Sequence, residues 1–217
     1  MESVDVASTD SAPFRDRREG GSALAARLGW YAGRDDVTVL GLARGGVPVA
    51  AEVAGRLCAP LDVLVVRKLG LPWAPEVAFG AIGPDGVLIR SEDQPDGVTP
   101  GDLDDVLAAE RTELDRQDTL YRADHPALDL HDRITVIVDD GLATGSTARA
   151  AIAVARQRNA VRVVLGVPVG HPTSLDALSH VADEVVCPLV PRDFSAVGQF
   201  YQDFRQVPDA EVRGLLG

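Results

Sequence analysis

Residues 134–147 constrain the fold of this chain more than any other stretch. The first five are apolar or β-branched, a pattern typical of a strand buried on both faces of a parallel sheet. Asp139 and Asp140 follow directly, and beyond the loop around Gly145 residues 148–158 favour a helix. Ligands of such sheets bind at the carboxyl ends of the strands, so we expect both acids at a binding site.

The loop after the two acids has the composition of an anion site. Gly145 permits backbone angles that let successive N–H groups converge, and the following helix start carries partial positive charge. We expect a phosphate monoester to bind the loop residues Ala143, Thr144, Gly145, Ser146 and Thr147. Because carboxylates repel phosphate, Asp139 and Asp140 fit a ligand that also offers a sugar diol, with or without Mg²⁺. An ordinary turn with an Asp cap is the alternative, but a cap needs only one polar residue.

Residues 136–147 resemble the signature of type I phosphoribosyltransferases, which bind 5-phosphoribosyl 1-pyrophosphate (PRPP). Gly141 departs from that pattern, because the family more often has an aliphatic residue there. The resemblance implies a ribose 5-phosphate site at Asp139, Asp140 and the loop that follows. Two further motifs, at residues 37–46 and 61–72, extend it along the chain in order.

A second candidate anion loop follows the apolar residues 37–42. Two glycines, Gly45 and Gly46, bare the backbone amides, and Arg44 offers a forked donor that suits phosphate oxygens. The resemblance implies that this loop binds pyrophosphate and contains a cis non-proline peptide, at Leu42–Ala43 or one bond later. A simple tight turn is the alternative.

The third motif begins with a strand at residues 61–66. It ends in Arg67 and Lys68, whose charges suit pyrophosphate unless they are plain surface charges. The order of residues resembles adenine phosphoribosyltransferases, in which this stretch leads into a mobile loop that closes over the active site and excludes water. Here that loop would be residues 69–81. Glu76 lies within it, either to assist proton transfer to the acceptor or as a solvated loop acid.

The tail, residues 188–204, holds four of the eight Phe and Tyr residues. In the family, the acceptor pocket lies in a variable hood outside the core strands, often with an aromatic ring stacked on the base. The resemblance therefore makes Phe194 a candidate stacking partner. Phe200, Tyr201 and Phe204 have a spacing that suits a helix face anchored to the core.

Composition sets further limits. At 217 residues we expect one domain, residues 13–217, after a disordered leader of residues 1–12. The net charge of −12 argues against nucleic-acid binding, and no apolar run approaches the roughly 20 residues that span a bilayer. The N-terminus resembles no secretory signal, and Cys58 and Cys187 suggest no disulfide framework, so we expect a reduced, cytoplasmic protein.

Alternating strands and helices predict an α/β fold with a doubly wound, mainly parallel sheet flanked by helices, and the resemblance adds a small hood from the N-terminal or C-terminal segments. The function implied is a Mg²⁺-dependent phosphoribosyltransferase of nucleotide salvage, transferring ribose 5-phosphate from PRPP to a base. Asp139 and Asp140 would hold the metal directly or through ribose hydroxyls and water. A non-catalytic PRPP or nucleotide sensor on the same fold is the alternative. The acceptor base and the oligomeric state, a homodimer included, stay open.

Overall fold

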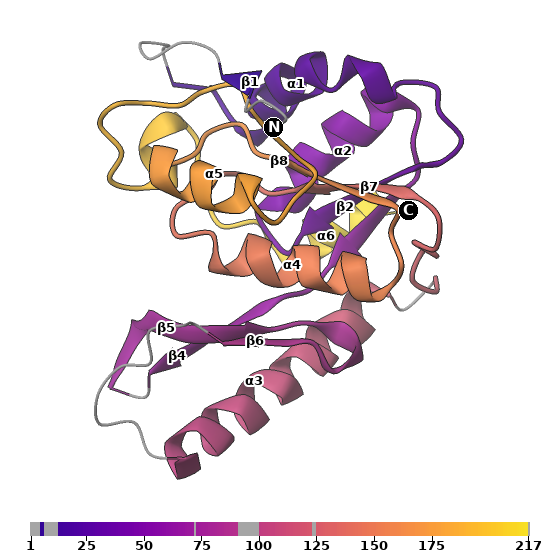
Figure 1. Ribbon diagram of the computed structural model, residues 1–217. Helices are drawn as coiled ribbons and strands as arrows, with labels where there is room; N and C mark the ends of the chain where they lie inside the picture. The colour runs from indigo at the N-terminus through magenta and orange to yellow at the C-terminus, as the bar shows by residue number, and fades with distance from the viewer. Residues whose placement is uncertain (1–4, 7–12, 72, 91–99, 123–124, 217) are drawn as a thin grey trace.

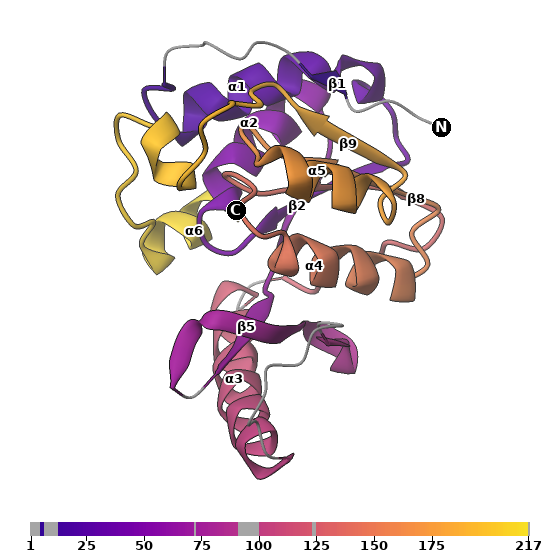
Figure 2. The ribbon, with the colours of Figure 1, turned by 60° about the vertical axis from the view of Figure 1, so that its left-hand side comes forward.

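The structure is a computed structural model that describes residues 5–6, 13–71, 73–90, 100–122 and 125–216. The side chains of residues 5–6, 75–78, 100 and 102 lie outside that description. Figures 1 and 2 show a parallel sheet between layers of helices, with a smaller antiparallel sheet and a long helix beneath it. The predicted doubly wound α/β fold is confirmed.

The larger sheet has six parallel strands within the described residues. Their spatial order is β1-β9-β8-β7-β2-β3, and their bounds are β1 Asp5–Val6, β9 Glu184–Cys187, β8 Arg162–Gly166, β7 Ile134–Val138, β2 Val37–Leu42 and β3 Leu61–Leu64. In the central pair Val37 lies opposite Ile134 and Gly41 opposite Val138. All residues of β2 and β7 are buried, as expected for strands covered on both faces. Strand β1 lies in the stretch expected as a leader, and the rest of that stretch is outside the described residues.

Helices cover both faces of this sheet because neighbouring strand residues point in opposite directions. One face, which includes Val39 and Val136, packs against α1 (Arg17–Arg27) and α2 (Gly46–Leu57). The other, which includes Leu40 and Ile137, packs against α4 (Ser146–Gln157) and α5 (Pro172–Ser179). Asp16 caps the start of α1, because its side chain accepts a hydrogen bond from the Glu19 amide at 2.9 Å. Helix α1 leads into the short 3-10 helix η1 (Gly29–Tyr31).

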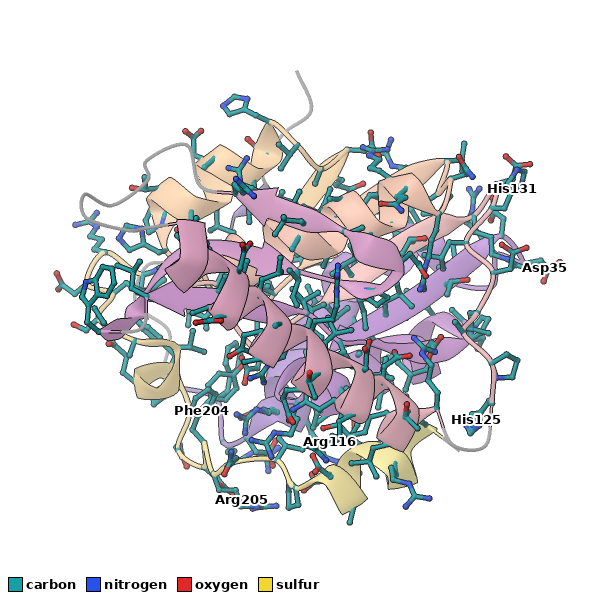
Figure 3. All side chains as sticks on the ribbon, turned by 90° about the horizontal axis from the view of Figure 1, so that it is seen from below. Asp35, Arg116, His125, His131, Phe204 and Arg205 are labelled. Carbon is teal, nitrogen blue, oxygen red and sulfur yellow. The ribbon has the colours of Figure 1, made fainter. Side chains whose placement is uncertain are left out.

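The smaller sheet corrects the expectation of a loop at residues 69–81. Strands β4 (Arg67–Leu71) and β5 (Ala74–Ile82) pair antiparallel there, and the turn η2 (Pro84–Gly86) leads to β6 (Leu88–Arg90), which pairs antiparallel with β5. Leu69, Leu71 and Phe79 are buried against residues of α3 (Pro100–Tyr121). That packing favours strands despite the Gly and Pro residues nearby. Figure 3 shows α3 crossing the molecule on this side.

The tail does not form the predicted helix face. Its helical part is one 3-10 turn, η3 (Val197–Phe200), after which Tyr201 forms an isolated bridge with Phe14. The rings do anchor the segment, because Tyr201 is buried and packs with Phe14, Phe200 and Phe204 against Val169 and Leu189. The chain then reaches α6 (Asp209–Leu216), which packs against α2 and α3.

Candidate functional site

The strand order reverses direction between β2 and β7. From β2 the chain continues to β3 on one side of the sheet, and from β7 it continues to β8 on the other. The loops after these two neighbouring strands lead to helices on opposite faces of the sheet, α2 on one and α4 on the other, and open α/β sheets bind ligands at such a position. Each loop is taken together with the first residues of the helix that follows it. The β2–α2 loop (residues 43–46) and the β7–α4 loop (residues 139–147) are the two that the sequence singled out.

The two loops are in close contact, and glycine makes the contact possible. A Cβ atom on Gly45 would lie 2.1 Å from Oδ2 of Asp140, and one on Gly46 would lie 2.5 Å from the Val138 carbonyl oxygen. Any side chain at either position would push the loops apart. The Ala43–Arg44 peptide is cis, the second of the two positions predicted.

Asp139 and Asp140 (the acid pair) each have one carboxylate oxygen bound within the protein. The Asp140 amide donates to Oδ1 of Asp139 at 2.9 Å, and Arg17 donates to Oδ2 of Asp140 from Nε at 2.9 Å. Within the described part of the chain, no other residue donates a hydrogen bond to Oδ2 of Asp139 or Oδ1 of Asp140. Two carboxylate oxygens are thus left to accept from a ligand.

Burial and mutual repulsion shape the charge of the acid pair. Burial raises the pKa of Asp139 well above the usual carboxyl range, the charge of Asp140 adds to the rise, and Lys68 works against it. Burial also raises the pKa of Asp140, while Arg17 opposes the rise. A ligand that brings hydroxyl donors or a cation would therefore be favoured at this pair.

The rest of the β7–α4 loop presents unused donors. Among described residues, no backbone or side-chain acceptor is bonded to the amides of residues 144–147, which precede or open α4. Gly145 has φ +80°, which turns the chain into the helix, and the hydroxyls of Thr144 and Ser146 lie 3.5 Å apart. The Ser174 hydroxyl of α5 donates to the Ala143 carbonyl and ties the loop to its neighbour. A helix start with free amides and adjacent hydroxyls is suited to an anion.

Arg44, Arg67 and Lys68, the cations predicted to bind pyrophosphate, do not form a cluster of unpaired charges. Nη1 of Arg44 lies 3.7 Å from Oδ1 of Asp209 on α6, and Nε of Arg67 donates to Glu110 on α3 at 2.7 Å. Lys68 is exposed, and of the three it is the cation whose charge lowers the pKa of Asp139.

Two other predicted residues lie elsewhere. Glu76 is in β5, and its side chain lies outside the described residues. Phe194 stacks on Phe200 with ring centres 5.5 Å apart, and His171 meets it edge-on at 5.5 Å. His171 precedes α5, and its amide donates to Leu142 in the β7–α4 loop at 2.9 Å, so the Phe194 ring is near that loop.

Sequence reasoning missed two residues that hold the acid pair. Arg17 binds Asp140, and Tyr201 donates its hydroxyl to the Asp140 carbonyl at 2.6 Å. The concentration of aromatic residues in the tail is a signal for Tyr201. Arg17 stands among other arginines, Arg15 and Arg18, and no local pattern separates it from them.

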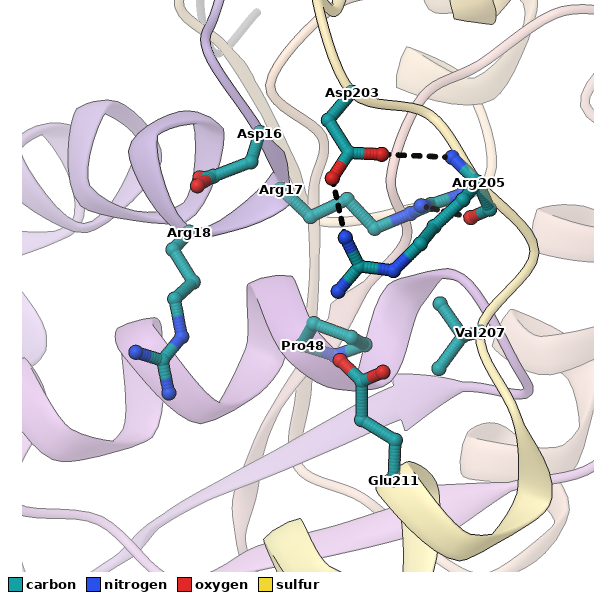
Figure 4. A pocket seen from close by; sticks show the side chains of 8 residues that line it. All are labelled: Asp16, Arg17, Arg18, Pro48, Asp203, Arg205, Val207 and Glu211. Carbon is teal, nitrogen blue, oxygen red and sulfur yellow. Dashed lines mark hydrogen bonds and ion pairs between the residues drawn. The ribbon is translucent and has the colours of Figure 1, made fainter.

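A cleft of 310 Å³ opens beside Arg17 (Figure 4). It lies between the start of α1, the first turn of α2 and the chain that leads to α6. Its lining residues are Asp16, Arg17, Arg18, Pro48, Asp203, Arg205, Val207 and Glu211. Positive and negative groups alternate there, so the cleft has no preference for one sign of charge.

The acid pair suits Mg²⁺ only in part. In nucleotide and phosphate sites this ion is commonly held by one or two carboxylates, with substrate oxygens and water completing the shell. The free oxygens of Asp139 and Asp140 fit that role. No group of three or more His, Cys, Asp or Glu side chains among the described residues is arranged to hold a metal by itself. None of the described helices is long and apolar enough to cross a membrane.

Comparisons with known proteins give matches over most of the chain. The model of the phosphoribosyl transferase domain family matches residues 19–205. Two Mycobacterium tuberculosis proteins, from strains CDC 1551 and H37Rv, carry the provisional name phosphoribosyl transferase; both are 50% identical over 205 residues, which is 94% of this chain. The chain spans 46% of the length of these curated relatives. The crystal structure of TT1426 from Thermus thermophilus matches with a TM-score of 0.80 and 43% identity, over 94% of this chain and 97% of that one.

Proposed function

Because the chain belongs to the phosphoribosyl transferase domain family, we propose that it transfers ribose 5-phosphate from PRPP to a nitrogenous base and releases pyrophosphate. The observation that carries this proposal is that one loop presents both unbonded hydrogen-bond donors and unbonded acceptors to a ligand. The amides of residues 144–147 can hold the 5-phosphate, while one oxygen each of Asp139 and Asp140 can accept from the ribose diol.

The remaining roles are those that the resemblance to the family implies. Gly45, Gly46 and Arg44 would hold the pyrophosphate, together with Arg67 and Lys68, and Arg44 and Arg67 would exchange an acidic partner for it. Phe194 would stack on the acceptor base, and Glu76 would assist proton transfer. We assign residues 13–217 to one domain, with the hood formed by α1 and the tail.

Catalysis in this proposal relies on positioning and charge. The bond from the anomeric carbon to pyrophosphate breaks as the bond to the acceptor nitrogen forms, and positive charge develops on the sugar ring. Asp139 and Asp140 lie where they can stabilise that charge, and the β7–α4 loop fixes the phosphate end of the sugar. The acid pair would hold Mg²⁺ through the ribose hydroxyls and water, and the ion would supply positive charge against the pyrophosphate. We place the reaction in cytoplasmic nucleotide salvage.

Pyrophosphate release from PRPP tests the proposal. The full chain is incubated with PRPP, Mg²⁺ and a panel of purine and pyrimidine bases, and release is measured for each base. We expect release with at least one base, and none from a variant with Asp139→Asn and Asp140→Asn whose circular dichroism matches that of the wild type. PRPP binding without turnover across the panel would favour a sensor instead, and undiminished turnover in the double variant would remove the acid pair from the site.

A further inference from the structure

Arg17 is the most heavily engaged side chain next to the acid pair. Nε donates to Oδ2 of Asp140 at 2.9 Å, and Nη2 lies 2.9 Å from the same oxygen. Nη1 donates to the Arg205 carbonyl at 2.8 Å, and the guanidinium plane lies over the Phe204 ring, 4.1 Å from its centre. Only 11% of the side chain is exposed, so the guanidinium is fixed from several directions.

The pairing of Arg17 with Asp140 is selective. Three other carboxylates, Asp16, Asp203 and Glu211, line the cleft beside Arg17 (Figure 4). Asp16 caps α1, and Asp203 accepts from Arg205, so these two acids have other partners. Arg17 binds the less accessible Asp140, whose side chain is 15% exposed. A salt bridge between exposed side chains contributes little to stability, whereas a partly buried carboxylate is destabilising unless it has a partner.

The contact also determines which oxygen of Asp140 remains available. Nε and Nη2 of Arg17 both contact Oδ2 of Asp140. Apart from Asp140 itself, no described residue donates a hydrogen bond to Oδ1. Asp139 is bound in the same one-sided way, through Oδ1, by the Asp140 amide. The acid pair therefore offers two separate acceptor oxygens, a number that matches the two hydroxyls of a ribose diol.

We propose that Arg17 is a positioning residue, which holds Oδ2 of Asp140 so that Oδ1 faces a ribose hydroxyl of the bound sugar phosphate. This inference rests on the proposed function, because it assumes a ribose at the acid pair. Arg17 acts through Asp140 and does not touch the ligand. Because Arg17 is held by the Phe204 ring and the Arg205 carbonyl, the orientation of Asp140 depends on these two residues as well as on α1.

Binding measurements with and without ribose test the role. Isothermal titration calorimetry on the full chain in Mg²⁺ compares PRPP, ribose 5-phosphate and inorganic pyrophosphate, for the wild type and for Arg17→Gln. We expect Arg17→Gln to weaken the affinity for PRPP and ribose 5-phosphate by about 10- to 100-fold, the effect found when a group that orients a metal-binding side chain is removed. Pyrophosphate affinity should stay within about twofold, because no ribose hydroxyl is involved. Loss of pyrophosphate affinity to the same extent would overturn the inference in favour of a general structural role.

A double-mutant cycle separates action through Asp140 from direct action. In an Asp140→Asn background, Arg17→Gln should cause little further loss of PRPP affinity, because the group it positions is already altered. Additive losses would overturn the inference. Arg15→Gln is the matched control, since Arg15 also pairs with a carboxylate, Glu19, but its side chain is 75% exposed and donates to neither acid of the pair; its affinities should equal those of the wild type.

A further variant and the turnover of the wild type distinguish failure of the inference from failure of the proposed function. Arg17→Lys keeps the charge but lacks the fork that reaches both Asp140 and Arg205, so we expect an intermediate loss of PRPP affinity. It replaces Arg17→Gln if that variant does not fold, and wild-type affinity in Arg17→Lys would then overturn the inference. If the wild type binds PRPP and turns it over while the Arg17 variants bind it equally well, the inference alone fails. If the wild type binds no ribose ligand, the proposed function fails and the inference falls with it.

Discussion

The side chain of Tyr31 links protonation to folding. It is 8% exposed, it donates a hydrogen bond to Glu184, and Nε of Arg162 donates to its oxygen at 3.3 Å. Burial, and next the hydrogen bond to Glu184, raise the pKa of Tyr31 from 10.0 to about 12. The folded protein therefore holds this proton more tightly than the unfolded chain does between those two values.

The stability contributed by Tyr31 should be fully present below pH 10 and should disappear as the pH rises to about 12. A shift of two units corresponds to at most about 3 kcal/mol in the free energy of unfolding. Tyr31→Phe cannot ionise, and Arg162 still pairs with Glu184 at 3.1 Å in its absence. Urea denaturation across this pH range should show a smaller loss of stability in the variant than in the wild type. Equal losses in the two proteins would contradict the prediction.

The contact between the β7–α4 loop and the turn η3 explains why the chain has a glycine where the family more often has an aliphatic residue. A Cβ atom on Gly141 would lie 2.4 Å from one methyl carbon of Val197 and 2.8 Å from the other. Gly141→Ala should therefore lower the free energy of unfolding by about 1–3 kcal/mol, the range for an overpacked site. Thermal and urea unfolding measure the change.

Two variants control for this prediction. Adding Val197→Ala to Gly141→Ala removes the colliding methyl groups, so most of the lost stability should return. Gly55→Ala, in α2, meets no atom within 4 Å and should raise stability by up to about 1 kcal/mol through helix propensity. A Gly141→Ala protein as stable as the wild type would show that η3 moves away from the loop at little cost.

The helices and strands differ in how far their sequence predicts them. Strands β2 and β7 are buried on both faces, so their apolar runs carry enough local information to place them and the loops that follow. Residues 69–81 contain Gly70 and Gly80, which favour a loop, but β4 and β5 pair and pack against α3. The rings after η3 pack individually against Val169 and Leu189, and this tertiary packing overrides their helical spacing.

The molecule as a whole brings together residues that no local pattern can pair. Arg17 and Asp140 are 123 positions apart, and Tyr201 reaches the Asp140 carbonyl over 61 positions. The β7–α4 loop was predictable because a helix start and a glycine turn form it locally. The partners of its acids were not, because they depend on how α1 and the tail fold back over the carboxyl ends of the strands.

The buried ion pair of Asp62 and Arg122 also joins residues that are far apart in the sequence. It connects the parallel sheet with the part formed by α3 and the antiparallel sheet. Nη1 of Arg122, just beyond α3, donates to both carboxylate oxygens of Asp62 in β3 at 2.8 Å. The amides of Val63 and Leu128 also donate to Asp62, at 2.7 and 2.9 Å. Arg122 itself reaches the Val63 carbonyl at 2.7 Å and Asp118 at 2.8 Å. Each side chain of the ion pair is 12% exposed.

Asp62→Ala leaves the Arg122 charge without its bidentate partner and two amides without acceptors, so it should cost about 3–5 kcal/mol in the free energy of unfolding. Hydrogen exchange should show α3 and the antiparallel sheet losing protection before β2 and β7, because the broken contact joins those parts. Glu113→Gln on α3 breaks a solvent-exposed pair with Arg116, the residue labelled in Figure 3, and should change the free energy of unfolding only slightly. Replacing both partners, with Asp62→Leu and Arg122→Met, should recover much of the loss, because no uncompensated charge remains buried. If Asp62→Ala costs no more than Glu113→Gln, the pair does not hold the two parts together, and apolar packing of α3 against the small sheet must do so alone.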